Sequence, residues 1–444
     1  MRKRIQFVFF FLQTFLERHK REIIISSLSG FLTTLFFIQA YPVYKELLGR
    51  THQRIGVIGA FNQTSLPLFI QNQISLGLTS LTPGGEPGPS LASSWEVNGK
   101  GIIYIFRLVK NLVWSDGKKF TVKDIQYHIK DVSFAPIDAY TLQVTLKEPY
   151  APLPVLLAQP LFRPNLAGRG AYKVMKLTYS GDTISELVLE GKERNLPLKT
   201  YKFYSTTGEA LLAFKAGEVD ILHNVPDIGN LKEWKGVKIT EVTLYDRFVG
   251  IFLNLKNGLL KEKEIRQALA YAVPKFPNVE KAFTPISPLS WGYSQKIRLY
   301  NFDADTARKI LAKSPLASSS NELTLSTYAS LLQRAQEIAE SWKGAGVAVK
   351  VKVETSIPDD YQAFLLTQAI PHDPDQYQFW QSLQDVTNIT HYSNPKIDKL
   401  LEDGRKTFDL AARKKIYADF QRYLVDDSPV LFLYYPKVYT VERQ

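Results

Sequence analysis

A run of 22 uncharged residues near the N-terminus is the feature that most constrains this chain. Residues 23–44 read IIISSLSGFLTTLFFIQAYPVY and contain no Asp, Glu, Lys or Arg. At ~1.5 Å per residue, a helix of this length reaches ~33 Å, which matches the ~30 Å hydrocarbon core of a lipid bilayer. The run therefore predicts one transmembrane helix that anchors the rest of the chain to the cell membrane.

The charges that precede this run predict its orientation. Residues 1–22 carry six basic and two acidic side chains, a net charge of +4. Because an excess of Lys and Arg marks the cytoplasmic side of a span, residues 1–22 are predicted to be cytoplasmic, with a possible interfacial helix over 5–16. Residues 45–53 would then form a tether to an extracytoplasmic domain. A cleaved secretory signal is the alternative.

The composition of the whole chain excludes several classes of protein. The 444 residues include no Cys and have a net charge of +12. Without Cys there is no disulfide, no Cys-based metal site, no cysteine nucleophile and no lipid attached at a cysteine. The positive charge first suggests nucleic acid. After the N-terminal block, however, the basic residues are spread among acids and the predicted orientation places them outside the cell, so no nucleic-acid partner is expected.

The periodicity of the apolar residues predicts a mixed α/β body. Residues 347–354 (VAVKVKVE) alternate as a half-buried strand does, and residues 331–342 before them show helical spacing. Residues 248–255 are typical of a buried strand, and a helix is predicted over 261–272. Further predicted elements are strands over 101–109, 141–148 and 239–244, and a helix that opens at the capping box Thr121–Asp124.

Motifs for catalysis are missing from the sequence. The six histidines are scattered, and there is no His-x3-His pair, Gly-x-Ser-x-Gly elbow or Gly-x4-Gly-Lys-Ser/Thr loop. The paired acids Glu262/Glu264 and Asp426/Asp427 lie in charged stretches and are interpreted as solvated surface residues. The chain is therefore not expected to be an enzyme, or to hold a cofactor or a metal.

Several motifs resemble, in order, those of the family 5 extracellular solute-binding proteins, the peptide-, dipeptide- and nickel-type receptors of ABC importers. The resemblance covers residues 54–440. The motifs lie at Ser90–Val97, Tyr104–Leu108, Trp114–Gly117, Phe120–Ile125, Tyr140–Tyr150, Gly168–Tyr172, Ala213–Ile221, Leu253–Leu255, Ile265–Leu269, Asp373–Asp375 and Leu431–Pro436.

The resemblance implies a two-lobed periplasmic-binding-protein-like fold (type II, three subdomains) with a hinge. Lobe I would span 54–252 with an inserted subdomain at about 82–164, lobe II would span 253–428, and residues 429–444 would return to lobe I. A peptide or similar small solute would bind between the lobes and favour their closure. It would then pass to ABC permease subunits, whose ATPase must be a separate chain.

Seven residues are candidates for contact with this ligand. In the segment that follows His372, a carboxylate of Asp373 or Asp375 could pair with a ligand ammonium, and Phe379 or Trp380 could stack on the ligand. The alternative is an Asp-Pro-Asp turn that caps the next helix above packed aromatics. The other candidates are Asn254, which is otherwise a strand-end turn residue, and Trp291 and Tyr293, which otherwise pack in the core.

One position departs from the family pattern. Peptide binders of this family carry an acid four residues before the motif proline, where it holds the amino terminus of the peptide, and here that position is Ile370. An amine anchor of the usual kind is therefore not expected. The predicted function is a membrane-anchored, extracytoplasmic substrate-binding protein of an ABC importer. A sensory or scaffolding ectodomain and a surface hydrolase are the alternatives, although no output domain and no catalytic pair is found.

Overall fold

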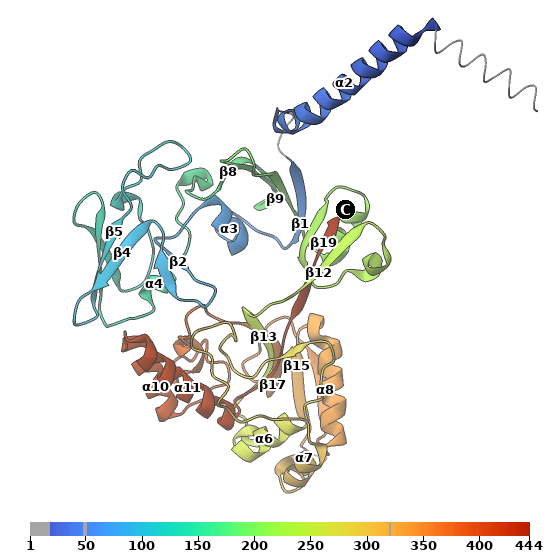
Figure 1. The fold of residues 1–444 in the computed structure, drawn as a ribbon. Coiled ribbons are helices and arrows are strands. Elements are labelled where there is room, and N and C mark those ends of the chain that lie inside the picture. Colours follow the sequence, from blue (N-terminus) through green and yellow to red (C-terminus); the bar gives the residue numbers. More distant parts are fainter. Residues whose placement is uncertain (1–17, 48–50, 319–320) are drawn as a thin grey trace, which may run out of the picture.

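The computed structural model describes residues 18–47, 51–318 and 321–444 and shows a mixed α/β protein (Figure 1). A seven-stranded and a six-stranded sheet form the centres of two lobes, and a four-stranded sheet lies in a third unit beside the first lobe. The predicted α/β class and the two-lobed arrangement are confirmed. The possible helix over 5–16 lies outside the described residues, and so do residues 1–17 of the predicted cytoplasmic segment.

The first lobe is built on the seven-stranded sheet. Helix α5 (Thr207–Lys215) connects β10 (Leu198–Tyr204) to β11 (Ile221–Val225) and returns the chain in the same direction. Strand β1 (His52–Ile58) lies between these two strands and therefore pairs in parallel with both. The order across the sheet is β12 (Val237–Thr243), β19 (Lys437–Arg443), β11 (Ile221–Val225), β1 (His52–Ile58), β10 (Leu198–Tyr204), β9 (Thr183–Gly191) and β8 (Tyr172–Ser180), with helices α3 (Leu68–Ile74) and α5 (Thr207–Lys215) packed against it.

The second lobe is built on the six-stranded sheet. Its central strand is β13 (Arg247–Leu253), whose side chains alternate between two buried faces of the sheet. Val249 and Ile251 pack against one layer of helices, whereas Phe248 and Phe252 pack against another. The predicted buried strand is therefore confirmed. The order across the sheet is β14 (Glu280–Lys281), β18 (Val430–Tyr435), β13 (Arg247–Leu253), β17 (Ala363–Ala369), β15 (Leu323–Thr327) and β16 (Val349–Val353).

Helices cover both faces of this second sheet (Figure 1). The predicted helices over 261–272 and 331–342 are confirmed as α6 and α8. The helices on the face of Val249 are α6 (Lys263–Tyr271), α7 (Ala304–Leu311) and α8 (Leu332–Gly344), and those on the face of Phe248 are α9 (Tyr377–Trp380), α10 (Pro395–Lys406) and α11 (Leu410–Asp427).

The third unit, here called the insert (residues 79–156), has its own apolar core around Phe106, Trp114 and Phe120. Its predicted strands over 101–109 and 141–148 are confirmed as β5 and β7. It contains β2 (Thr79–Leu81) paired with β3 (Pro87–Pro89), the sheet β4 (Ala92–Val97), β5 (Ile103–Leu108), β7 (Thr141–Leu146) and β6 (Val132–Pro136), and helix α4 (Leu153–Leu156).

The helix predicted to open at Thr121 is reduced to one 3-10 turn, η1 (Val122–Asp124). Asp124 accepts the N–H of Thr121 at 2.8 Å, as a capping box requires, but its other oxygen binds Arg163 at 2.8 Å. The chain then turns extended because Ile125 is buried in the insert core. The other 3-10 turns are η2 (Pro164–Leu166), η3 (Gly229–Glu233), η4 (Gly258–Leu260), η5 (Pro315–Ala317) and η6 (Ala329–Leu331).

The chain crosses between the two large sheets twice, and these crossings form the hinge. The first crossing is residues 244–246, between β12 and β13, and the second is Pro436, between β18 and β19. The Leu244 N–H donates to the Pro436 carbonyl at 2.8 Å, so the crossings lie side by side. The predicted lobe boundaries, at 252/253 and 428/429, lie one strand away from these crossings. The prediction assigned β13 and β18 to the first lobe, whereas both strands belong to the sheet of the second lobe.

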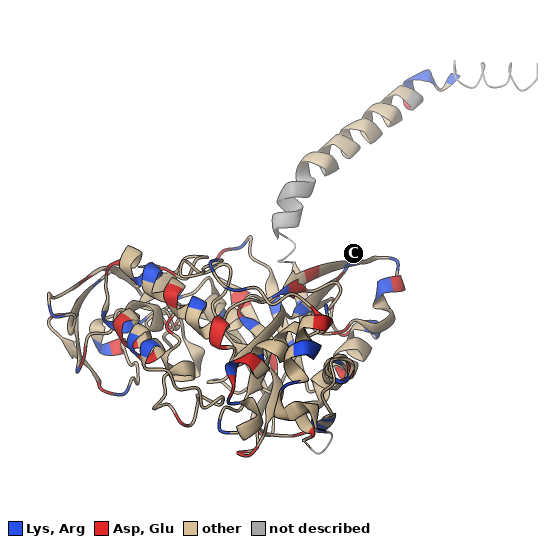
Figure 2. Ribbon diagram, turned by 90° about the horizontal axis from the view of Figure 1, so that it is seen from below, with Lys and Arg blue, Asp and Glu red and all other residues tan. Residues whose placement is uncertain are grey.

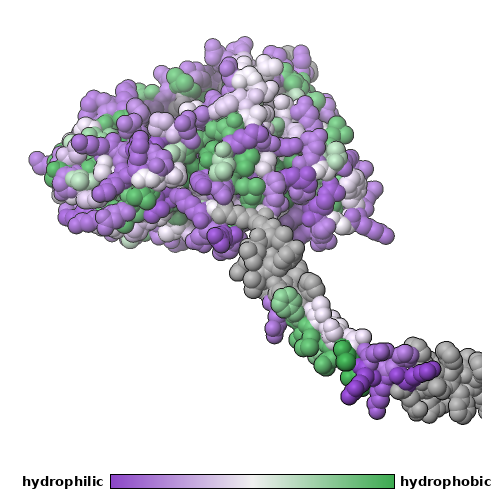
Figure 3. All heavy atoms as spheres, turned by 90° about the horizontal axis from the view of Figure 1, so that it is seen from above, coloured by the Kyte–Doolittle hydropathy of each residue, from purple (hydrophilic) through white to green (hydrophobic). Residues whose placement is uncertain are grey.

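Helix α2 (Lys20–Leu47) contains the uncharged run and carries exposed apolar side chains, several of which are visible in Figure 3. Among the described residues, no helix is long and apolar enough to cross a membrane. The transmembrane helix predicted over 23–44 is therefore not supported. Within α2, the Thr33 and Thr34 hydroxyls donate to the backbone carbonyls of Ser29 and Gly30. Of the predicted tether, Lys45–Leu47 belong to α2 and β1 begins at His52.

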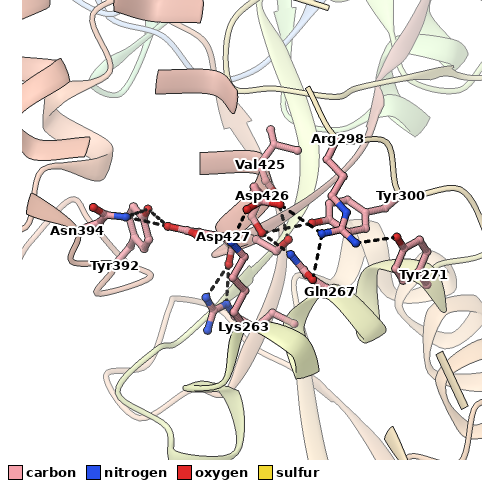
Figure 4. A network of polar contacts seen from close by, with 12 residues as sticks. Lys263, Gln267, Tyr271, Arg298, Tyr300, Tyr392, Asn394, Val425, Asp426 and Asp427 are labelled. Atoms are coloured by element: carbon pink, nitrogen blue, oxygen red, sulfur yellow. Dashed lines mark hydrogen bonds and ion pairs between the residues drawn. The ribbon is translucent and has the colours of Figure 1, made fainter. Parts of the chain in front are cut away.

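Charged side chains of both signs are interspersed over the two lobes (Figure 2). The pair Asp426/Asp427, predicted to be solvated, instead belongs to a polar network at the C-terminus of α11 (Figure 4). Asp427 accepts hydrogen bonds from the Tyr392 hydroxyl at 2.6 Å and from the Asn394 amide at 2.9 Å, and Lys263 pairs with both carboxylates.

Candidate functional site: the hinge cleft

A cavity of about 250 Å³ lies at the hinge and is lined by parts of both lobes and the insert. We call it the hinge cleft. Its lining comes from a loop of the insert, from the first hinge crossing and from two loops of the second lobe. The lining residues are Pro83, Gly84, Gly85, Thr243, Leu244, Tyr245, Asp246, Ser287, Leu289, Ser290, Ile370, Pro371 and His372.

Close backbone contacts hold the walls of the hinge cleft together. The Trp291 N–H donates to the Gly84 carbonyl at 3.1 Å, which joins the second lobe to the insert. Gly85 has φ +83°, and a Cβ at this position would lie 2.5 Å from the His372 carbonyl oxygen. Only glycine fits this conformation and this close approach.

The electrostatics of the hinge cleft are dominated by one carboxylate. Asp246 is the only acid among the described residues that line it. Arg247 donates to both oxygens of Asp246 at 2.9 Å, and this hydrogen bonding raises the pKa of Arg247. The charge of Asp246 is thus largely compensated within the protein. Ile370, at the family position of the amine anchor, contributes only apolar surface and is 8% exposed.

The predicted acidic pair lies behind the hinge cleft, not in its lining. Asp373 is buried and accepts hydrogen bonds from Arg413 at 2.7 and 3.1 Å. Asp373 also accepts the N–H of Asp375, and Asp375 accepts the N–H of Tyr377, the first residue of α9. The Asp-Pro-Asp segment is therefore a turn at the start of α9, as its structural alternative predicted.

Asp375 joins the second lobe to the insert. Its carboxylate accepts hydrogen bonds from Arg405 Nε at 2.9 and 3.1 Å and from the Tyr150 hydroxyl at 3.3 Å. Burial raises the pKa of Asp375 although Arg405 opposes that shift. The Ala151 N–H also donates to the Arg405 carbonyl at 2.7 Å. These contacts, here called the cross-lobe contacts (Tyr150 and Ala151 with Asp375 and Arg405), hold the lobes together.

The predicted aromatic residues are placed differently from one another. The Trp291 ring contacts both Arg413, 5.1 Å from its centroid, and Tyr417, and the Trp291 N–H donates to the insert beside the hinge cleft. Tyr293 and Phe379 are partly buried and pack against the apolar cluster that contains Phe248 and Phe252 of β13. Trp380 is buried and stacks on Phe252.

Asn254 is buried at the end of β13 and does not line the hinge cleft. Its amide donates to the Tyr361 carbonyl at 2.8 Å, and its oxygen accepts the N–H of Lys256 at 3.0 Å. Both ends of the side chain are thus occupied, the oxygen by the turn that follows β13 and the amide by the segment that precedes β17. The ligand contacts proposed for Asn254 and the other six residues remain a prediction from the sequence.

Apart from Ile370, sequence reasoning missed the residues that determine the chemistry of the hinge cleft and of the buried pairs behind it. Asp246 had a usable signal, since it lies in the short link between two predicted strands. No local sequence signal points to Arg405 or Arg413, because their partners, Asp375 and Asp373, lie 30 and 40 residues away along the chain. Within the described residues, no group of three potential ligands is placed to hold a metal ion.

Residues 86–390 match the family described as bacterial extracellular solute-binding proteins, family 5 Middle. The oligopeptide-binding protein AppA of Bacillus subtilis is 27% identical over 275 residues, which cover 53% of this chain and 50% of AppA, so that alignment spans half of the relative. A dipeptide-binding protein of Escherichia coli is 21% identical over 476 residues, which cover 86% of each chain.

Solved structures share the fold. NikZ from Campylobacter jejuni, in complex with Ni(L-His), has a TM-score of 0.72 and 23% identity, over 88% of this chain and 94% of NikZ. AppA from Bacillus subtilis, in complex with a nonapeptide, has a TM-score of 0.70 and 22% identity, over 89% of this chain and 95% of AppA. Because the family model matches residues 86–390, more than half of the chain, the chain belongs to the family 5 bacterial extracellular solute-binding proteins, and it is a binding protein, not an enzyme.

Proposed function

We propose that this chain is the substrate-binding component of an ABC importer and captures a peptide or similar small solute in the hinge cleft. The observation that carries the proposal is the three-part lining of that cleft. A ligand that contacts the insert, the hinge and the second lobe together binds the closed arrangement better than an open one, and so shifts the population toward it. Relatives named for oligopeptides and dipeptides support this ligand class.

Delivery to a permease completes the proposal. The sequence has no phosphate-binding loop, so the ATPase is a separate chain. The family description, extracellular solute-binding proteins, supports a position of the two lobes outside the cytoplasm. The closed lobes would present the ligand to the permease subunits.

Attachment to the membrane through residues 23–44 is a further part of the proposal. It is supported by the 22 uncharged residues, by the basic residues before them and by the exposed apolar side chains of α2, such as Ile24, Leu28 and Leu32. Fractionation of cells tests it: the protein is expected in the membrane fraction after high salt and alkaline washes. Recovery in the soluble fraction after those washes would contradict attachment.

The ligand is tested on the purified full chain in lipid nanodiscs. Mass spectrometry of co-purified small molecules is combined with thermal unfolding in the presence of dipeptides, oligopeptides and a nickel–histidine complex. A ligand at 100 times its Kd should stabilise the protein by about 2.7 kcal/mol. Peptide hydrolysis, or no stabilisation by any of the three classes, would reject the proposal.

A pair of variants locates the ligand. Leu289 lines the hinge cleft and is 59% exposed, whereas Leu299 is 51% exposed and lies outside its lining. Leu289→Trp narrows the cleft and is expected to weaken binding by tenfold or more, while Leu299→Trp leaves it unchanged. Equal effects would place the ligand elsewhere.

The amino group of a bound peptide is expected to contribute little to the affinity of the protein for that peptide. Ile370 supplies no charge, and Asp246 already pairs with Arg247 at 2.9 Å. Acetylation of the peptide N-terminus should therefore change Kd by less than tenfold, about 1.4 kcal/mol. Calorimetry with free and acetylated forms of one peptide measures this, and a larger loss would show that the protein does hold the amine.

A further inference from the structure

A second cavity, of about 290 Å³, lies within the second lobe and shares no lining residue with the hinge cleft. It lies against strand β18, which neighbours the short edge strand β14, and residues 430–433 of β18 form one wall. Residues 273–283, 298–302 and the end of α11 form the others. We call it the lobe II cavity, and no step of the proposed function uses it.

The lining of the lobe II cavity is largely apolar. Phe276, Phe283 and Phe302 line it together with Val279 and Leu433. Transfer of apolar surface from water into such a site is favourable by roughly 25 cal/mol per Å². The cavity volume is near the lower end for small-molecule pockets, ~300 Å³, so the lining suits a compact apolar group.

The polar part of the lining carries one sign of charge. Lys275, Lys281 and Arg298 line the cavity, and none of the described residues that line it carries a carboxylate. Arg298 is already engaged by Asp426 at 3.3 Å and by the Tyr271 hydroxyl, as Figure 4 shows. The two lysines are therefore the cations with capacity for a ligand.

The two lysines lack a counter-charge in the described structure. Lys281 donates to the Tyr300 carbonyl at 2.8 Å and lies 5.4 Å from the Phe283 ring centroid. Lys275 is exposed and has no hydrogen-bond or ion-pair partner among the described residues. Lys281 is also exposed, but partial desolvation of its ammonium group, and then the charge of Lys275, lower its pKa. An anion between the two lysines would remove this repulsion.

We propose that the lobe II cavity binds a small organic carboxylate with an apolar body, whose carboxylate pairs with Lys281 and Lys275 and whose body fills the phenylalanine-lined space. The inference is independent of the peptide proposal, since the two cavities have different linings. A ligand in the lobe II cavity would also contact β18, the strand that leads to the second hinge crossing.

The test uses 3-phenylpropanoate as the probe, with 3-phenylpropylamine and 3-phenyl-1-propanol, which have the same carbon skeleton, as controls. Isothermal calorimetry is carried out on the full chain in lipid nanodiscs, with empty nanodiscs as the blank. The carboxylate is expected to bind at least tenfold more tightly than either control. No binding of the carboxylate, or equal binding of the amine or the alcohol, would overturn the proposal.

Variants assign the site. Lys281→Gln is expected to weaken binding of 3-phenylpropanoate by tenfold or more, and Lys275→Gln by a smaller factor. Lys309→Gln, on the exposed side of α7 and outside the cavity lining, is the matched control and should bind as the wild type does. Val279→Trp fills the cavity and should abolish binding. Thermal unfolding confirms that each variant folds, and unchanged binding in Lys281→Gln and Val279→Trp would contradict the assignment.

Discussion

Arg413 joins several parts of the buried interior of the second lobe. It holds the buried Asp373 carboxylate through two hydrogen bonds, donates to the Gly404 carbonyl and lies over the Trp291 ring. Removal of one partner from a buried ion pair leaves the other charged and without compensation, which typically costs about 3–5 kcal/mol. Arg413→Met should therefore lower the free energy of unfolding by that amount, as measured by urea denaturation.

The same helix provides the control. Arg422 pairs with Asp419 on the surface of α11, where the two side chains are 47% and 52% exposed. Solvent screens such a pair, so Arg422→Met should leave the urea midpoint close to that of the wild type. A similar loss in both variants would mean that α11 tolerates no Arg→Met change, and would remove the special role given to Arg413.

Two constraints favour glycine at position 85: a left-handed backbone conformation and the close approach to the His372 carbonyl. Gly117 has the first constraint but not the second, so it allows the two to be separated. Gly85 and Gly117 have φ +83° and +82°, so Ala should strain the backbone equally at both, by about 1 kcal/mol. Only Gly85 has a neighbour, the His372 carbonyl oxygen, within 4 Å of the added Cβ on the second lobe. Gly85→Ala should lose more stability than Gly117→Ala, because it adds a clash with the His372 carbonyl to the shared backbone strain, and only Gly85→Ala should weaken ligand binding. Calorimetry with the ligand found on the purified protein measures the difference, and equal affinities would show that this contact does not support closure.

At the scale of elements, the C-terminus of α11 carries charges of the wrong sign. Asp426 and Asp427 lie where the helix dipole favours cations. The structure compensates with basic side chains: Lys263 pairs with both acids, and Arg266 donates to the Asp427 carbonyl and to two carbonyls before α6. The network therefore ties the end of α11 to the start of α6 (Figure 4).

This network makes a pH-dependent contribution to stability. Burial tends to raise the pKa of Asp427, but hydrogen bonds from Tyr392, Lys263 and Asn394 outweigh it and hold the pKa below 3.8. The unfolded chain thus binds a proton more readily, so the stabilisation is complete above about pH 3.8 and is lost as the pH falls through the folded pKa. Asp427→Asn should cost about 1.5–3 kcal/mol at pH 7 and remove this acid-dependent part of the loss.

Thermal unfolding between pH 7 and pH 3 measures that prediction. Asp385→Asn, at an exposed acid of the same lobe, is the control and should follow the wild-type profile. If Asp427→Asn keeps the full acid-dependent loss of the wild type, the Asp427 carboxylate is not its source.

The elements differ in how far the sequence predicts them, for physical reasons. Strand β13 is predictable because its side chains are apolar on both faces, and α6 because its apolar residues form one stripe. The helix at Thr121 is not, since the local capping signal is outweighed by the burial of Ile125 and by the Asp124–Arg163 pair. Local patterns fix an element when its tertiary contacts favour the same conformation.

At the scale of the whole molecule, the site is less predictable than the elements. The hydrogen bond from Tyr150 to Asp375 joins residues 225 positions apart, and no periodicity reports such a contact. The motif that contains Asp373 and Asp375 marks the right region, but whether a carboxylate faces a ligand or an arginine depends on where α10 and α11 pack. Family resemblance predicts the two lobes because they depend on the whole order of motifs, whereas the individual contacts depend on this chain alone.

If the lobes open and close as proposed, the cross-lobe contacts should set the balance between the two states in the absence of ligand. Two hydrogen bonds, from the Tyr150 hydroxyl and from the Ala151 N–H, span from the insert to the second lobe, and Lys406 pairs with Glu148 at 3.1 Å beside them. Because the apparent Kd equals the intrinsic Kd divided by the closed fraction, these contacts should strengthen ligand binding without touching the ligand.

The double variant Tyr150→Phe/Lys406→Ala tests this coupling. It removes one hydrogen bond, roughly 0.5–1.5 kcal/mol, and one surface ion pair, so the open fraction should rise and the apparent Kd should increase by up to about tenfold. The chain has no native Cys, so spin labels at Lys119→Cys and Glu402→Cys report the distance between the insert and α10 without background. The variant should show a longer mean distance than the wild type without ligand and the same distance at saturation. If the unliganded distance distributions coincide while Kd rises, the lost side chains act on the ligand itself and not on lobe closure.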